Sequence, residues 1–151
     1  MVFLIVIAAL TAIGAAVPPL LIRRSRDRLA AGILARGGAA PALLTPADRC
    51  TGRFRRVPGV LGLDGPAIFF ESRHEPRLDL PLARIRKIST GSRMTTTGRR
   101  LLRAEVVTLT SSDGAVDEFL MPKASAYQWR QHLGAWAARE KAPGDGVRPG
   151  R

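Results

Sequence analysis

The sequence predicts a mainly β domain of the α+β class: a bent antiparallel sheet, forming a partly open barrel, with a C-terminal helix capping it and one transmembrane helix preceding it. Three observations support this prediction. Residues 1–22 carry no charged side chain. The middle of the chain consists of short runs of β-branched and aromatic residues separated by turn residues. After Pro122 the hydrophobic spacing changes from the period of a strand to that of a helix.

Residues 1–22 are expected to cross a membrane. At about 1.5 Å per residue the run spans the roughly 30 Å hydrocarbon core of a bilayer. Arg23, Arg24, Arg26 and Arg28 follow it at once, and the positive-inside rule places such a cluster in the cytoplasm. We therefore expect a single-pass protein of the cell membrane, with the N-terminus outside and the domain cytoplasmic. The alternative is a cleaved signal peptide, but such a peptide requires a basic region before its apolar core.

Residues 23–48 are expected to form a basic juxtamembrane segment and a linker. Apolar residues at helical spacing predict a short helix over residues 23–36, which Gly37 ends. This helix either leaves the bilayer with snorkelling arginines or lies at the interface and binds anionic head groups. Residues 37–48 are rich in Gly, Ala, Pro and Leu without a clear period, which is typical of a linker. The domain is then expected to begin at Arg49.

Short strands are expected along the next part of the chain. The expected runs are 50–57, 60–63, 67–71, 78–82, 85–88, 103–110 and 115–121. Pro58 and Gly59 are expected to separate the first two. Gly65 and Gly114 belong to tight turns, since Gly adopts positive φ at little cost. Pro81 indicates an edge strand or a bend, because it lacks a backbone donor.

A helix of about four turns is expected after Pro122. Its apolar stripe consists of Ala126, Trp129, Leu133, Trp136 and Ala137. Both tryptophans are expected to pack on the sheet and not to bind a ligand. Ser125 and Gln128 match a capping box at its start. The helix is expected to end near Lys141, and residues 142–151 to form a disordered tail.

The order of these elements resembles that of GRAM and pleckstrin-homology-like domains, and such a domain is expected over residues 49–141. The resemblance rests on segments 59–64 and 68–72, on 80–82 followed by Ile85 and Ile88, on 107–109, Asp113-Gly114 and Phe119, and on the final tryptophan-bearing helix. The layout is also similar to small actinobacterial single-pass proteins of uncharacterised function. The resemblance implies a binding module, because eukaryotic relatives often recognise phosphoinositides or protein partners. Phosphoinositide-binding members place basic residues in the loop between their first two strands, whereas here that loop is only Val57–Gly59.

The histidines and the cysteine of this chain do not form a recognisable catalytic pattern. His74 and His132 have no Cys or His at metal-binding spacing, and Cys50 has no nearby base. The chain contains no nucleophile elbow, phosphate-binding loop or dinucleotide fingerprint. We therefore expect no enzyme activity, no metal site and no cofactor.

The net charge of +12, from 24 Lys and Arg against 12 Asp and Glu, favours an anionic partner. Between Asp79 and Glu105 the chain has no acidic residue but carries Arg84, Arg86, Lys87, Arg93, Arg99, Arg100 and Arg103. The loop Ser92–Arg99 is rich in Thr and Gly, whose hydroxyls and amides suit a phosphate. We expect a membrane-anchored cytoplasmic module that reads anionic lipid head groups through this basic face.

Two alternatives to lipid binding stay open. The basic face can be a solvated surface without a ligand, or the domain can be a protein-interaction scaffold in an envelope complex. Nucleic-acid binding fits the charge, but aromatic residues do not alternate with the basic ones as base stacking requires.

Overall fold

The fold is described here from a computed structural model, which places residues 21–36, 40–51 and 55–141, and side chains up to Gly134. The strands are β1 (Leu43–Thr51), β2 (Arg55–Asp64), β3 (Ala67–Ser72), β4 (Leu78–Pro81), β5 (Ile85–Gly91), β6 (Ala104–Ser111) and β7 (Val116–Pro122). A short 3-10 helix, η1 (Leu82–Arg84), lies between β4 and β5. The C-terminal helix α2 covers Lys123–Lys141. A further helix covers residues 21–35.

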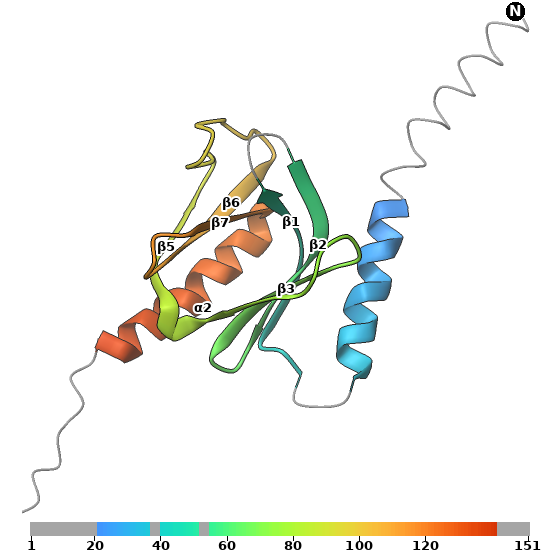
Figure 1. The fold of residues 1–151 in the computed structure, drawn as a ribbon, viewed down its shortest axis with the longest axis horizontal. Coiled ribbons are helices and arrows are strands. Elements are labelled where there is room, and N and C mark those ends of the chain that lie inside the picture. The colour runs from blue at the N-terminus through green and yellow to red at the C-terminus, as the bar shows by residue number, and fades with distance from the viewer. Residues whose placement is uncertain (1–20, 37–39, 52–54, 142–151) are drawn as a thin grey trace, which may run out of the picture.

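In the described part of the chain, seven strands form one sheet in the order β4-β3-β2-β1-β7-β6-β5. Every pairing is antiparallel, and the sheet curls around α2 (Figure 1). β1 pairs with β2 along its whole length, from Leu43 to Thr51. It pairs with β7 only over Asp48–Cys50, so the two strands diverge and the barrel stays half open. The predicted mainly β architecture with a C-terminal helix is confirmed.

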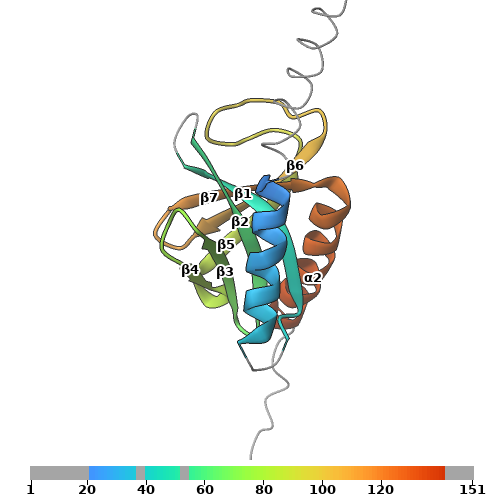
Figure 2. The same cartoon turned by 90° about the vertical axis from the view of Figure 1, so that its right-hand side faces the viewer.

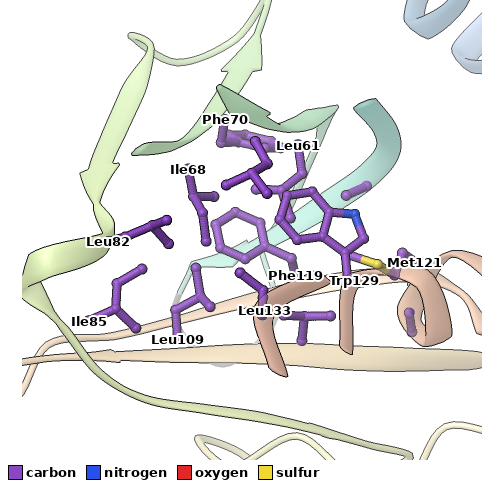
Figure 3. Close-up of a cluster of buried hydrophobic side chains, with 14 of the residues drawn as sticks. Leu61, Ile68, Phe70, Leu82, Ile85, Leu109, Phe119, Met121, Trp129 and Leu133 are labelled. Carbon is purple, nitrogen blue, oxygen red and sulfur yellow. The ribbon is translucent and has the colours of Figure 1, made fainter. Parts of the chain in front are cut away.

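The core lies between the concave face of the sheet and α2 (Figure 3). Trp129 is completely buried there, as its place in the apolar stripe predicts. The rings of Phe70 and Phe119 pack with their centroids 5.5 Å apart. Burial of large apolar side chains such as these contributes about 1.5–3 kcal/mol each. The side chain of Trp136, which was expected on the same stripe, lies outside the described residues.

The first strand begins earlier than the sequence predicts. Residues 43–48, expected in the linker, form the first part of β1. The predicted strand 50–57 is instead divided between β1 and β2. Residues 43–48 contain only one β-branched side chain and a proline, so their strand character has little local signal. It comes from tertiary burial, since Thr45 and Ala47 face the core.

The expected break at Pro58 and Gly59 is wrong, because both residues lie inside β2. Gly59 suits this position for a steric reason. A Cβ there would collide with the carbonyl oxygen of Glu71 and the ring of Phe70 on the neighbouring strand. The glycine therefore allows close strand packing and does not mark a turn.

The later turns form where the sequence predicts them. Gly65 (φ +52°) joins β2 to β3, and Gly114 (φ +86°) lies in the turn from β6 to β7. Pro81 ends the edge strand β4, and η1 then turns the chain toward β5. Ile85, the first residue of β5, is buried in the core.

Helices cover both faces of the sheet. α2 fills the concave face, and the helix over residues 21–35 lies across β1 and β2 on the convex face (Figure 2). The helix predicted over residues 23–36 is thus present, and it covers residues 21–35 with Arg36 in the turn that follows it. α2 begins at Lys123, so Ser125 lies in its first turn and not at the expected N-cap.

The predicted transmembrane segment falls almost wholly outside the described residues, which begin at Leu21. Within the ranges that the structure places, no helix has the length and apolar character needed to cross a bilayer. The expected tail, residues 142–151, also lies outside the described chain.

Candidate functional site

Two ion pairs hold the helix over residues 21–35 on the sheet. Arg26 pairs with Asp48 of β1, and both side chains are half buried. Arg36 forms a bidentate contact with Glu71 of β3, with 2.8 Å between Nη1 and Oε2. The hydrogen bond and the charge of Glu71 raise the pKa of the Arg36 guanidinium. Arg26, one of the expected juxtamembrane arginines, therefore stabilises the packing of the helix on the sheet.

The other expected juxtamembrane arginines face the solvent. Arg23, Arg24 and Arg28 are exposed on the helix. Arg23 and Arg24 lie in its first turn, next to Leu21, where the described chain begins.

The loop over residues 92–103, between β5 and β6, folds onto the convex face and is anchored by Glu118. This carboxylate is only 1% exposed and lies on β7. It accepts hydrogen bonds from the backbone N–H groups of Thr95 and Thr96 and from the Thr96 hydroxyl. Because a buried carboxylate is costly without such donors, the loop supplies what Glu118 needs.

Met94 is a second anchor of loop 92–103. It is 5% exposed and packs in a small apolar cluster with Cys50, Leu101, Val106 and Leu120. Three backbone hydrogen bonds close the loop, from Met94 N to Arg99 O, from Gly98 N to Met94 O and from Leu101 N to Ser92 O. Gly98 adopts φ +67°, which suits glycine. The loop therefore has a defined shape.

The structure divides the predicted basic residues between the two ends of β5. Arg93, Arg99, Arg100 and Arg103 belong to loop 92–103, next to the pair Gly91–Val106. Arg84, Arg86 and Lys87 lie at the opposite end, next to the pair Ile85–Ser111. A strand of this length separates its ends by roughly 20 Å. All of these side chains are exposed, but they do not form one patch.

Loop 92–103 lies at the same end of the molecule as the start of the helix over residues 21–35 (Figures 1 and 2). A hollow of about 260 Å³ lies on this side, with Arg26, Arg56 and Arg103 in its lining and Asp48 as its acidic member. We call this end of the molecule the basic end. It comprises Arg23, Arg24, Arg26, Arg56, Arg93, Arg99, Arg100 and Arg103.

Arg56 was not among the residues singled out from the sequence. It lies opposite Cys50 in the β1–β2 ladder, close to the hairpin end of both strands. Its position depends on where β1 ends and β2 begins, which the sequence pattern placed incorrectly. A correct assignment of that hairpin would have brought Arg56 to the basic end.

Arg86 and Lys87, at the other end of β5, line a groove between this edge strand and α2. The groove has a volume of about 240 Å³ and is lined by Ile85, Arg86, Lys87, Ile88, Thr90, Arg130, Leu133 and Gly134. In the described sheet β5 pairs with β6 alone, so its outer edge leaves backbone groups without a strand partner.

Cys50 is a half-buried free thiol in β1. Burial raises the pKa of this thiol to about 11, although the charge of Arg56 opposes the rise. Little thiolate is therefore present at neutral pH. His74 and His132 are exposed. Among the residues that the structure places, no three His, Cys, Asp or Glu side chains form a group suited to a metal ion.

The comparisons with known proteins concern the fold alone. No family model matches the chain, and no curated protein matches it. Among solved structures, the chain is similar to the C-terminal domain of an unknown protein from Leishmania infantum. The TM-score is 0.51 at 11% identity, over 78% of this chain and 95% of that one. The fold and the surface together define a curled β domain of the α+β class with one strongly basic end.

Proposed function

We propose that this protein is a membrane-anchored, non-catalytic binding module of the GRAM or pleckstrin-homology-like type, whose basic end docks on anionic lipid head groups at the cytoplasmic surface of the cell membrane. The position of loop 92–103 carries the proposal. The loop lies at the same end as the start of the helix over residues 21–35 (Figure 1), and in the sequence this helix follows the apolar segment 1–20. A chain anchored through that segment would turn its basic end toward the bilayer.

The charges of loop 92–103 support docking because they are uncompensated. Among the ion pairs of the described residues, none involves the four arginines of this loop. Arg26, Arg36 and Arg49, by contrast, are each paired with a carboxylate. Each free basic residue near an anionic membrane surface contributes about 1 kcal/mol of attraction.

The full chain in lipid nanodiscs provides a direct test. Cys50 is the only cysteine, so Cys50→Ser with Ser92→Cys allows one donor dye to be placed in the loop. Energy transfer from this dye to acceptors on the lipid head groups reports docking. We expect stronger transfer in phosphatidylglycerol than in phosphatidylcholine. Added salt should weaken it, because exposed charges are screened beyond roughly 8 Å at physiological ionic strength.

Two triple variants with equal loss of charge separate the basic end from the rest of the surface. Replacing Arg93, Arg99 and Arg100 by Ala should remove up to about 3 kcal/mol, roughly a hundredfold in the docking constant. Replacing Arg84, Arg86 and Lys87 by Ala removes the same charge at the other end of β5 and should have little effect. Equal losses in both variants, or equal transfer in neutral and anionic lipid, would contradict the proposal.

A protein-interaction role in an envelope complex is the second candidate, and the groove between β5 and α2 favours it. Arg86, Lys87 and Arg130 surround this groove, whose lining also includes Ile85 and Leu133. An extended acidic segment of a partner could pair with the free edge of β5 while its side chains meet these cations. Co-purification from native membranes tests this role. A partner lost in the Arg84, Arg86 and Lys87 variant, but retained in the loop variant, would favour the scaffold.

A further inference from the structure

Leu102 is the most exposed of the large apolar side chains in the described chain, with 83% of its surface accessible. It lies in loop 92–103, between Arg100 and Arg103. Its neighbour Leu101 is partly buried and packs against the apolar cluster around Met94. Two adjacent leucines thus have opposite environments, one holding the loop to the sheet and the other facing the solvent.

The fold of the loop keeps Leu102 exposed. The backbone N–H of Leu101 donates to the carbonyl oxygen of Ser92 at 2.6 Å, and a β-bridge joins Arg93 to Arg100. Glu118 holds the other part of the loop through the amides of Thr95 and Thr96. The chain before Leu102 is therefore held in place by the loop, and β6 begins two residues after it, at Ala104.

A single exposed leucine is ordinary on a protein surface. The setting of Leu102 is unusual, because the exposed Arg99, Arg100 and Arg103 are close to it in sequence and its loop lies at the same end of the molecule as the start of the helix over residues 21–35. One leucine among arginines makes too small an apolar area for a protein interface. It fits a lipid surface, where an apolar layer lies directly beneath anionic phosphates.

We propose that Leu102 inserts into the apolar layer of the bilayer while Arg99, Arg100 and Arg103 stay at the level of the lipid phosphates. This inference rests on the proposed function and adds an apolar contact to the electrostatic one. Arginine side chains suit the arrangement because their stems can lie along apolar groups while their guanidinium groups reach the phosphates. Burying a leucine side chain in an apolar medium favours the bound state by roughly tenfold to a hundredfold.

Insertion can be measured in the full chain in anionic nanodiscs. In a Cys50→Ser background, Leu102→Cys carries an environment-sensitive dye. Its emission should shift to shorter wavelength, and lipids with spin labels on their acyl chains should quench it. Val116→Cys is the matched control, because Val116 is also exposed (39%) but lies at the other end of β6, opposite Thr110. Equal quenching at both positions would overturn the proposal.

Leu102→Ser tests insertion with the native loop charges in place. Because the side chain is exposed, the thermal midpoint should not change, and Leu102→Met should behave like the parent. With the dye at Ser92→Cys, Leu102→Ser should lower the docking constant roughly tenfold to a hundredfold. If the arginine variant weakens docking but Leu102→Ser does not, insertion is refuted and the proposed function stands. If neither variant weakens docking, both the insertion of Leu102 and the proposed function are refuted.

Discussion

The indole Nε1 of Trp129 donates a hydrogen bond to the hydroxyl oxygen of Thr45 at 3.1 Å. Both residues are buried, and the bond joins α2 to β1 across the core. Thr45 lies beyond Asp48–Cys50, the part of β1 that pairs with β7. α2 therefore holds this half of β1 in the place where a closed barrel would use a neighbouring strand.

Removing either partner of this bond should destabilise the domain. Thr45→Val leaves the buried indole N–H without an acceptor and should cost about 1–3 kcal/mol. Trp129→Ala should cost about 3–5 kcal/mol, because it also empties a large core site. Thr45→Ser keeps the hydroxyl and serves as the control. Chemical denaturation measures the free energy of unfolding, and parent-like stability of Thr45→Val would show that the bond contributes little.

The anchoring of loop 92–103 predicts a local effect at Glu118. Glu118→Ala removes the acceptor of the Thr95 and Thr96 amides and should cost about 1.5–3 kcal/mol, as for hydrogen bonds to a charged group. Hydrogen exchange should become faster at those two amides. Asp79→Ala removes an exposed carboxylate whose ion-pair partner among the described residues is Arg77, and it should change neither quantity noticeably. Unchanged exchange in Glu118→Ala would indicate that the loop keeps its shape without the carboxylate.

Breaking the contact between Arg26 and Asp48 should weaken the packing of the helix over residues 21–35 on the convex face. Asp48→Asn should weaken its packing by about 1 kcal/mol, since the pair is only half buried. Amide exchange over residues 21–35 should accelerate, whereas Asp64→Asn, at the exposed end of β2, should leave it unchanged. Arg26→Asp combined with Asp48→Arg should recover part of the loss. Identical exchange in both single variants would mean that apolar contacts alone hold the helix.

The Cys50 thiol predicts a pH dependence. Its pKa is raised by burial from 9.0 to about 11, so at pH 8 the folded protein should react with iodoacetamide roughly a hundredfold more slowly than the unfolded chain. The rate should rise as the pH approaches 11. Because the folded pKa is the higher one, the stability contributed by the neutral thiol is present below about pH 9 and is lost as the pH rises through 11. Equal rates in the folded and unfolded states would refute the burial of this group.

The later hairpins and the C-terminal helix were predictable because their signals are local. Gly65 and Gly114 occupy turns that require positive φ, and the helical stripe contains Trp129 at the spacing that the core needs. The first hairpin was not predictable in the same way. Residues 43–48 lack strand-forming side chains, and Gly59 looks like a turn residue until the close packing of β3 is known. Tertiary contacts override propensity at both places.

The candidate site was predictable in composition but not in arrangement. The sequence identifies an acid-free basic stretch, yet only the register of β5 shows that Arg84 and Arg100 lie at different ends. The partner of Arg26 lies 22 positions away, so its pairing has no local signal. The exposure of Leu102 has no signal in the sequence either, because the sequence does not show which of the two adjacent leucines packs against the apolar cluster.

The helix over residues 21–35 has a mechanical consequence. It starts at the basic end and runs about 22 Å along the sheet before the chain turns toward β1. A pull on Leu21 along the helix axis would load the Arg26–Asp48 and Arg36–Glu71 pairs in shear, and these pairs would pass the force to the interior of β1 and to β3, and not to the end of β1 at Leu43. Bonds loaded side by side share the force, whereas a strand peeled from its end breaks one bond at a time. Tension applied at Leu21 would therefore be resisted first by the two ion pairs on the surface of the domain.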